Sequence, residues 1–222
     1  MSLVMRRPVY DEEGGRYLRE LVSNQVSAGL NSAFLSRDVL ETLGFARLGE
    51  EVLIHSTAVI VDCHKLSLGS RVRIDPYVII SNQGGVEFGN NIHIGGHSVL
   101  AGNAAIRFDD FVTISHYVGI FTSSEGDIKD RALTNPTIPE RFRAVRSASI
   151  SFGRHAGAAA GSLILPGARF AEGTMLRPLS LVSRPLKPWT IYGGIPARLI
   201  RERQRHVLER EQEYLALLKK PR

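Results

Sequence analysis

The stretch VEFGNNIHIGGHSVL, residues 86–100, sets the pattern of the chain. Large apolar residues stand six positions apart in it, at Phe88, Ile94 and Leu100, and four positions after the first two comes a small or β-branched residue. Glycine directly follows Phe88 and Ile94. Because glycine has no Cβ, it lets the backbone turn where a side chain would clash. The stretch therefore predicts short strands joined by tight corners, with the large residues, here called anchors, pointing inward.

The same pattern repeats on both sides of this stretch with a step of 20 residues. The three series of anchors are Leu48, Leu68, Phe88 and Phe108; Ile54, Ile74, Ile94 and Ile114; and Ile60, Ile80, Leu100 and Ile120. Steps within one turn are six, six and eight residues, so two extra residues should bulge at one corner. A repeat of this kind predicts three-stranded parallel coils stacked on one another. A sandwich of unrelated strands would not keep three series at one constant step.

The repeat breaks after Ile120 and then returns without the two extra residues. The anchors of the second block are Phe152, Ala158, Ile164, Phe170, Leu176 and Val182. The segment 121–149 between the two blocks is therefore an insertion. Long loops in compact domains are usually functional, although a disordered insertion remains an alternative.

Helical segments are expected at both ends of the coil. The stretch from Tyr17 to Ser32 is weakly amphipathic, and Ser36 caps a short helix that ends at Gly44. The charged stretch from Ala197 to Lys219 has an apolar stripe and predicts a helix with one solvated face. The expected division is an N-terminal helical segment, a coil, and a turn with a C-terminal helix, over residues 1–45, 46–190 and 191–222.

Composition describes an ordinary globular chain of 222 residues, with 43% hydrophobic and 23% charged residues. The net charge of +6 suits an anionic small ligand. No basic stripe with stacking aromatic residues is present, which disfavours nucleic acid as a partner. The lone Cys63 excludes an internal disulfide, and neither a signal peptide nor a membrane span is evident, so we expect a cytoplasmic protein.

Three histidines stand on two successive turns, at positions 93, 97 and 116. His97 and His116 follow stacked anchors and should lie near one face, because neighbouring strands are about 4.8 Å apart. We interpret His93, His97 and His116 as candidate general bases. Glu125 and Asp127, at the edge of the insertion, are candidates to orient a histidine. The alternatives are ordinary surface histidines and two solvated loop carboxylates.

A turn with two adjacent glycines follows the last coil. Its sequence from Tyr192 to Arg198 is YGGIPAR. Gly193 and Gly194 would allow a ligand to approach the backbone closely, and Pro196 and Arg198 follow them. We predict that Gly193, Gly194, Pro196 and Arg198 contact a cofactor, with a plain turn as the alternative.

With these features the sequence resembles the hexapeptide-repeat acyltransferases. Their coil ends in a Gly-Asn/Val/Ile-Pro-Ala-Lys/Arg motif, which Gly194 to Arg198 matches, and the likeness extends from about Leu40 to Arg203. It is strongest to the enzymes that act on nucleotide-linked amino sugars, through Pro136 to Pro139 and, in part, His93 to Gly95. This resemblance implies a left-handed parallel β-helix, contrary to the usual right-handed crossover. It also implies a cytoplasmic homotrimer that uses acetyl-CoA in clefts between subunits.

One departure decides which histidine we favour. The O-acetyltransferase relatives have a catalytic histidine where this chain has Glu125, and their assisting asparagine falls at Gly95. Their catalytic pair therefore does not carry over, and His93 becomes the predicted base. The function implied is direct transfer from acetyl-CoA to the amine of a nucleotide-linked amino sugar in lipopolysaccharide or other surface polysaccharide biosynthesis, with no metal.

Three other functions remain open at this point. A sugar O-acetyltransferase would use the same coil with a hydroxyl acceptor. A γ-type carbonic anhydrase would hold Zn²⁺ with three histidines, which His93, His97 and His116 would have to supply. A non-enzymatic scaffold would use the coil only to bind other proteins.

Overall fold

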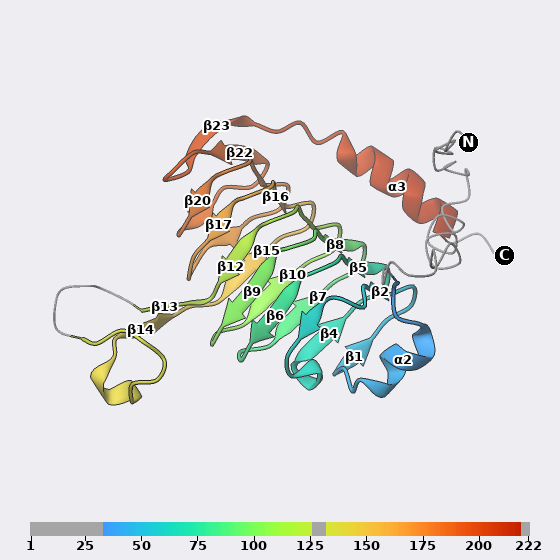
Figure 1. The fold of residues 1–222 in the computed structure, drawn as a ribbon. Coiled ribbons are helices and arrows are strands. Elements are labelled where there is room, and N and C mark those ends of the chain that lie inside the picture. The colour runs from blue at the N-terminus through green and yellow to red at the C-terminus, as the bar shows by residue number, and fades with distance from the viewer. Residues whose placement is uncertain (1–32, 126–131, 219–222) are drawn as a thin grey trace, which may run out of the picture.

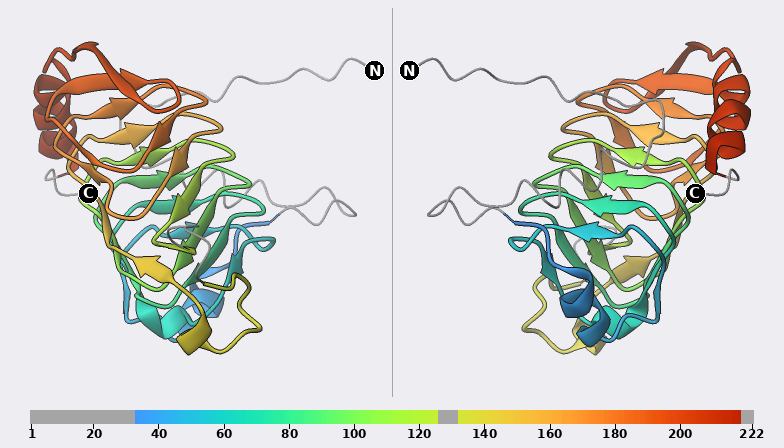
Figure 2. Two further views of the ribbon diagram at one scale, coloured as in Figure 1. Left: turned by 90° about the vertical axis from the view of Figure 1, so that its left-hand side faces the viewer. Right: turned by 90° about the vertical axis from the view of Figure 1, so that its right-hand side faces the viewer.

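The chain winds into a stack of triangular turns, with a short helix at one end of the stack and a longer helix along its outer side (Figure 1). In this computed structural model, residues 33–125 and 132–218 are described. Helix α2 (Arg37–Thr42) lies at the start of the stack. Helix α3 (Val207–Leu218) runs back along the outside of the coil, as both views in Figure 2 show.

Each turn except the last contributes one strand to each of three sheets, in which successive turns pair in parallel. The first sheet contains β1 (Arg47–Leu48), β4 (Leu66–Leu68), β7 (Val86–Phe88), β10 (Ile106–Phe108), β15 (Ile150–Phe152), β18 (Arg169–Phe170) and β21 (Pro185–Leu186). The second contains β2 (Leu53–Ile54), β5 (Val72–Ile74), β8 (Ile92–Ile94), β11 (Thr113–Ile114), β16 (Gly157–Ala158), β19 (Met175–Leu176) and β22 (Thr190–Gly193). The third contains β3 (Val59–Ile60), β6 (Ile79–Asn82), β9 (Val99–Gly102), β12 (Gly119–Phe121), β17 (Leu163–Ile164) and β20 (Leu181–Val182).

The predicted anchors form the core of this prism. Phe88, Phe108, Phe152 and Phe170 stack along its length with ring centroids 5.0, 4.9 and 4.5 Å apart. Strand register follows the 20-residue step, since Phe88 pairs with Phe108. Across the insertion Phe108 pairs with Phe152, so the coil continues in register on the far side. Full burial of each ring stabilises the fold by about 1.5–3 kcal/mol.

The outward sides of the three sheets differ in chemistry. The first sheet presents a mostly polar row, formed by Arg47, Ser67, Glu87, Arg107, Ser151, Arg169 and Pro185. The third sheet presents a wholly apolar row, here called the apolar face, formed by Val59, Ile79, Val99, Gly119, Leu163 and Leu181. The second sheet is mixed and carries Leu53, Arg73, His93, Thr113, Gly157, Met175 and Ile191. Of these three outward rows, only that of the second sheet carries a histidine, His93.

The insertion leaves the coil as a projecting arm (Figure 1). Strand β13 (Ser123–Glu125) pairs antiparallel with β14 (Val145–Ser147), and a short 3₁₀ helix covers Glu140–Phe142. The name "arm" is used below for residues 123–125 and 132–147. The arm has its own backbone pairing, so its described part is not a structureless loop.

Both ends of the coil differ from the prediction in detail. Helix α2 confirms the short helix after Ser36, although the Ser36 side chain makes no capping hydrogen bond. The helix predicted from Ala197 is wrong over its first part, because Arg198–Glu202 forms β23, antiparallel to β22. The edge of the last coil offers unpaired backbone groups, and pairing with them satisfies the chain better than an isolated helical turn. The stretch from Tyr17 to Ser32 lies outside the described residues.

Two other sequence predictions concern boundaries and membranes. The predicted division of the chain into residues 1–45, 46–190 and 191–222 stays a prediction. Within residues 33–125 and 132–218, no helix is both long and apolar enough to cross a membrane.

Candidate active site

Gly95 and Gly96 form the corner that follows β8, where neighbouring turns pack closely against each other. A Cβ on Gly96 would lie 2.9 Å from the Pro76 carbonyl oxygen, 3.4 Å from His116 Nδ1 and 3.9 Å from Asp75 Cβ. A Cβ on Gly95 would lie 2.6 Å from the carbonyl carbon of Ser115. A side chain at either position would collide with a neighbouring turn, so both glycines are needed for the close packing between Asp75 on the turn before and His116 on the turn after. This corner is called the glycine notch below.

His93 is held beside the notch by a buried carboxylate. Its Nε2 lies 2.8 Å from Asp75 Oδ2, and Arg73 Nε donates to Asp75 Oδ1 over 2.6 Å. The Asp75 residue is 4% exposed, while the His93 side chain is 36% exposed. The structure therefore pairs a partly exposed imidazole with a buried carboxylate that accepts two hydrogen bonds.

The electrostatics of the pair define its protonation. Burial by itself raises the pKa of Asp75, but the hydrogen bonds from His93 and Arg73 outweigh burial and hold that pKa below its usual value. Asp75 is therefore an ionised acceptor, and the hydrogen of a neutral His93 sits on Nε2. Nδ1 of His93 is left with a free lone pair, which is the form of imidazole that can accept a proton.

Asp75 was not among the residues selected from the sequence. It occupies the corner position directly after the anchor Ile74, which Gly95 and Ser115 occupy on the next two turns. A carboxylate among small residues at one corner was the available signal. The periodic pattern does not reveal this partner, because it does not show that the His93 side chain points to the turn before its own.

The other two predicted histidines have different surroundings. The His116 ring lies edge-on to His93, with centroids 6.5 Å apart, and borders the glycine notch. His97 is stacked between Tyr77 and Tyr117, at 4.9 Å from each ring. His116 is thus placed near the His93–Asp75 pair, while the contacts of His97 are those of a packed corner residue.

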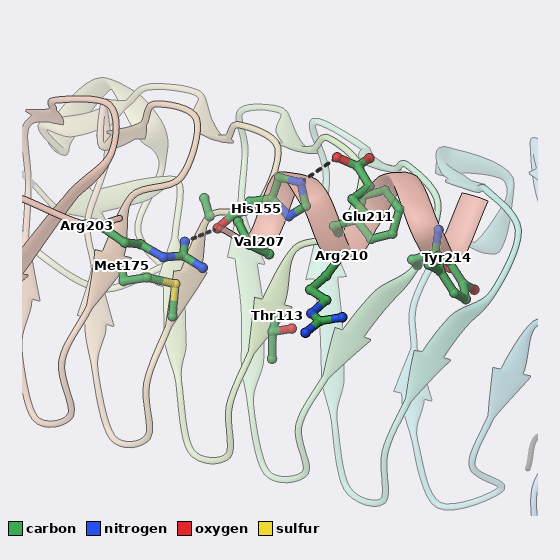
Figure 3. A pocket seen from close by; sticks show the side chains of 11 residues that line it. Thr113, His155, Met175, Arg203, Val207, Arg210, Glu211 and Tyr214 are labelled. Atoms are coloured by element: carbon green, nitrogen blue, oxygen red, sulfur yellow. Dashed lines mark hydrogen bonds and ion pairs between the residues drawn. The ribbon is translucent and has the colours of Figure 1, made fainter. Parts of the chain in front are cut away.

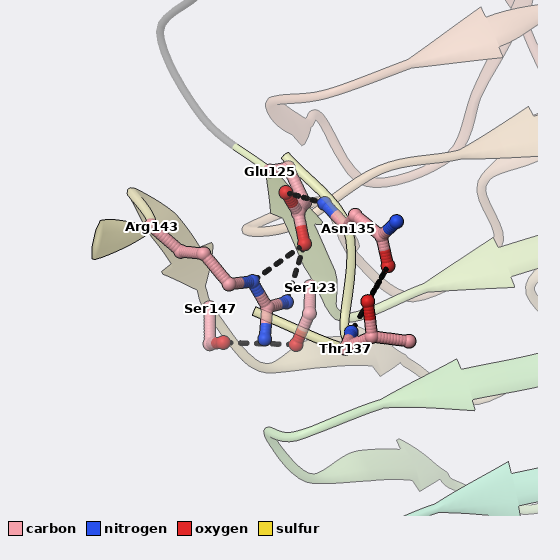
Figure 4. Close-up of polar contacts among 6 residues, drawn as sticks. All are labelled: Ser123, Glu125, Asn135, Thr137, Arg143 and Ser147. Carbon is pink, nitrogen blue, oxygen red and sulfur yellow. Dashed lines mark hydrogen bonds and ion pairs between the residues drawn. The ribbon is translucent and has the colours of Figure 1, made fainter. Parts of the chain in front are cut away.

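The arm uses its own carboxylate internally (Figure 4). Glu125 accepts a hydrogen bond from Arg143 Nε over 3.0 Å and another from the backbone N–H of Asn135 over 2.9 Å. Within this chain Glu125 therefore braces the arm. Its predicted role in orienting a histidine of a neighbouring copy stays a prediction, and Asp127 lies outside the described residues.

The C-terminal glycine motif closes the last turn of the coil. Gly193 ends β22, and Gly194 has a φ of +96°, a conformation that favours glycine. The Gly194 backbone N–H donates to Ser180 Oγ over 3.0 Å. Arg198 is exposed and begins β23, not the helix. The predicted cofactor contacts of Gly193, Gly194, Pro196 and Arg198 stay predictions.

Metal ligation finds no support in the geometry of the histidines. His93 turns to Asp75, and His97 lies between two tyrosine rings. Among residues 33–125 and 132–218 there is no group of three or more His, Cys, Asp and Glu side chains arranged to hold a metal ion.

Comparison with known proteins now supplies the family. No protein-family model matches the chain. The dTDP-4-amino-4,6-dideoxy-D-glucose acyltransferase of Escherichia coli is 32% identical over 180 residues, which is 81% of this chain and 93% of that protein. The chain belongs to the hexapeptide-repeat acyltransferases, among the nucleotide-amino-sugar enzymes.

Solved structures agree with this family. AntD, an N-acyltransferase from Bacillus cereus solved with dTDP and 3-hydroxybutyryl-CoA, is 31% identical, with a TM-score of 0.80 over 84% of this chain and 98% of its own. A maltose O-acetyltransferase from Clostridium difficile 630 is 13% identical, with a TM-score of 0.52 over 86% of each chain, and shows the fold alone. The predictions of a hexapeptide-repeat coil, of the left-handed β-helix class and of an acyltransferase are confirmed.

Proposed function

We propose that this acyltransferase moves an acyl group from acyl-CoA to the amine of a nucleotide-linked amino sugar, acetyl-CoA being the simplest donor. The observation that carries the proposal is the His93–Asp75 pair, bonded over 2.8 Å beside the glycine notch. A partly exposed base that a buried carboxylate holds on a rigid coil is what proton removal from an attacking amine requires. The names of the two relatives above 30% identity support the donor and the acceptor class.

The reaction needs one proton to move twice. The sugar amine attacks the thioester carbonyl carbon, and the carbonyl electron pair moves onto oxygen. His93 Nδ1 removes a proton from the attacking nitrogen, while the hydrogen bond to Asp75 stabilises the imidazolium. When the oxyanion collapses, the C–S bond breaks and His93 gives that proton to the leaving thiolate. The products are the amide and CoA, and no covalent enzyme intermediate is formed.

Backbone groups complete the site. We assign stabilisation of the oxyanion to the backbone N–H of Gly96, because the N–H of Gly95 already donates to the Ile114 carbonyl oxygen over 2.7 Å. Phosphates of CoA would meet exposed cations of the last turns, where Arg177, Arg184 and Arg198 stand. The glycine motif of residues 193–198 lies in the same region, in keeping with its predicted cofactor contacts.

A homotrimer is part of this proposal. Val59 and Ile79 of the apolar face are 53% and 40% exposed, and Leu163 and Leu181 extend the row without a polar interruption. Contiguous apolar surface of this kind marks an association site, and closed rotational symmetry leaves no copy of the face uncovered. Because the corner with the glycine notch joins the second sheet to the third, a neighbouring copy would border the site.

The cellular setting follows from the same chemistry. Nucleotide-linked amino sugars are precursors of surface polysaccharides, and we place the reaction in lipopolysaccharide or related biosynthesis. The free Cys63, whose thiol pKa is raised by burial, suits a reducing cytoplasm.

Product analysis tests the proposal directly. The purified protein is incubated with acetyl-CoA and a panel of nucleotide-linked sugars, among them dTDP-4-amino-4,6-dideoxyglucose and matched sugars with a hydroxyl in place of the amine. Mass spectrometry should find an added acyl group only on amine-bearing sugars. Acylation of the hydroxyl analogues alone would make the enzyme an O-acyltransferase, and acylation of none would overturn the proposal.

A further inference from the structure

A cavity of about 470 Å³ lies between α3 and the second sheet (Figure 3). Its floor comes from the second sheet and includes Thr113, Ala156 and Met175. The facing wall comes from α3 and includes Val207, Arg210 and Tyr214. Most of the lining surface is apolar. Apolar concave sites of this size are where proteins bury small ligands.

This cavity begins next to the proposed base. Thr113 on its floor is the direct register partner of His93 in the neighbouring strand. Paired strands are about 4.8 Å apart, so the cavity starts one strand from the imidazole. Asn91, two residues before His93, also lines it. A group attached to a thioester carbonyl at His93 would therefore reach the cavity without crossing the coil.

Gly157 leaves room for the Met175 side chain on the cavity floor. On the outward row of the second sheet, Gly157 follows Thr113 and precedes Met175. A Cβ on Gly157 would lie 2.9 Å from Met175 Cε and 3.0 Å from its Sδ. The flexible Met175 side chain thus lies over the glycine and can adapt to an apolar occupant.

The helical wall is fixed in place. Glu211 of α3 is 7% exposed, accepts a hydrogen bond from His155 Nε2 over 2.9 Å and forms an ion pair with Arg154. Tyr214 donates from its hydroxyl to Asn91 Oδ1 over 2.9 Å. Since a buried charge is tolerated only when it is paired, these contacts hold α3 at one distance from the sheet. The cavity is therefore a built site.

We propose that this cavity receives the acyl chain of the CoA donor beyond its carbonyl carbon and selects chains longer than acetyl. The inference rests on the proposed function. Of the three parts of the reactants, the nucleotide and the sugar are polar, and only the acyl chain gains free energy from an apolar lining. Its carbonyl carbon has to lie at His93, which fixes the end from which the chain enters.

The test compares acetyl-, butyryl- and hexanoyl-CoA in two measurements. Calorimetry without acceptor should show affinity rising by up to about fourfold for each buried methylene. Steady-state kinetics with one amino-sugar acceptor should show the same order in kcat/KM. Met175→Phe fills the cavity and should lower the hexanoyl-to-acetyl ratio of kcat/KM by about tenfold or more. Val207→Phe fills it from the opposite wall and should act in the same direction.

Controls separate the cavity from the rest of the enzyme. Arg169→Phe adds a ring on the first sheet, on the same turn as Met175, and should leave the chain-length profile unchanged. Thermal melting checks that each variant is folded. Equal affinity for the three esters, with an unchanged profile in both filled variants, would overturn the inference.

Failure of the proposed function gives a different result. If no ester acylates any amine while hexanoyl-CoA still binds more tightly than acetyl-CoA, and Met175→Phe removes that difference, the cavity assignment holds without the reaction. If acetyl transfer is observed and chain length has no effect on binding or rate, the reaction holds without the cavity assignment.

Discussion

His93 is predicted to carry the proton transfer, and its removal should affect the chemical step most. General base catalysis contributes about 10²–10⁴-fold, so His93→Ala should lower kcat by that order. Binding of CoA should change little, because the pair with Asp75 faces the notch and not the last turns. Steady-state kinetics measures the change in kcat, and calorimetry measures the change in CoA binding.

A histidine outside the site provides the control for that change. His64 is exposed in the short 3₁₀ helix Cys63–Lys65, and His64→Ala should keep the wild-type kcat. If His116→Ala loses activity while His93→Ala keeps it, the general base is His116 and not His93. Retained activity in both variants would show that no histidine of this site is the base.

Because of Asp75, the free energy of unfolding should depend on pH in the acidic range. Its pKa is lowered on folding, so the folded state takes up this proton less readily than the unfolded chain. The stabilisation is therefore complete above the unfolded value of about 3.9 and is lost as pH falls through the lower folded value. Asp75→Asn should cost about 1.5–3 kcal/mol at pH 7, the range for hydrogen bonds to a charged group, and less below a pH of about 3.9.

Urea unfolding at several pH values measures this difference. Asp109 forms an exposed pair with Arg107 and is the matched control, since Asp109→Asn should cost less than about 1 kcal/mol at any pH. A cost for Asp75→Asn that does not depend on pH would show that packing, not charge, is what the substitution removes.

Among the larger elements, the arm depends on one carboxylate for its internal order. The Glu125 side chain is 27% exposed and that of Arg143 is 16% exposed, so their ion pair is partly shielded from solvent. Glu125→Gln should weaken the arm by about 1 kcal/mol and speed its cleavage by a protease severalfold, while the melting temperature of the coil stays the same.

Kinetics of the same variant report whether the arm serves the reaction. If the arm of one copy borders the site of another, Glu125→Gln should raise KM for the sugar without weakening CoA binding. Glu140→Gln, in the exposed 3₁₀ helix of the same arm, is the control. Faster cleavage with unaltered KM would limit the arm to a structural role.

At the scale of the whole molecule, assembly should depend on the apolar face, which runs along the stack of turns. A charge in the middle of the apolar face should prevent copies from associating, because an unpaired buried charge is strongly destabilising. Ile79→Glu should therefore convert the proposed homotrimer to monomers in light scattering and lower kcat/KM if the site lies between copies. The control is Glu87→Lys on the polar row of the first sheet, and this variant should assemble as the unsubstituted protein does.

Sequence pattern alone reached the architecture because the coil is nearly one-dimensional. Each turn contacts only the turns before and after it, so the spacing of anchors such as Phe88 and Phe108 directly states which residues stack. The same logic located the insertion, since the repeat stops and resumes. The boundary of the last helix was not accessible in this way, because pairing of β23 with β22 depends on a free strand edge that exists only after the coil is built.

The stacked coil, its core and a corner rich in histidine could be predicted from the sequence, because a fixed period converts chain position into place on the prism. The bond between His93 and Asp75, and that between Glu125 and Arg143 of the same chain, emerged only in three dimensions, since the first joins an outward side chain to the corner of the preceding turn. The tertiary structure also decided that His97 stacks between two tyrosines and that α3 covers a cavity beside Thr113. Such contacts follow from side-chain direction and from the packing of distant segments, and a periodic pattern carries no information about either.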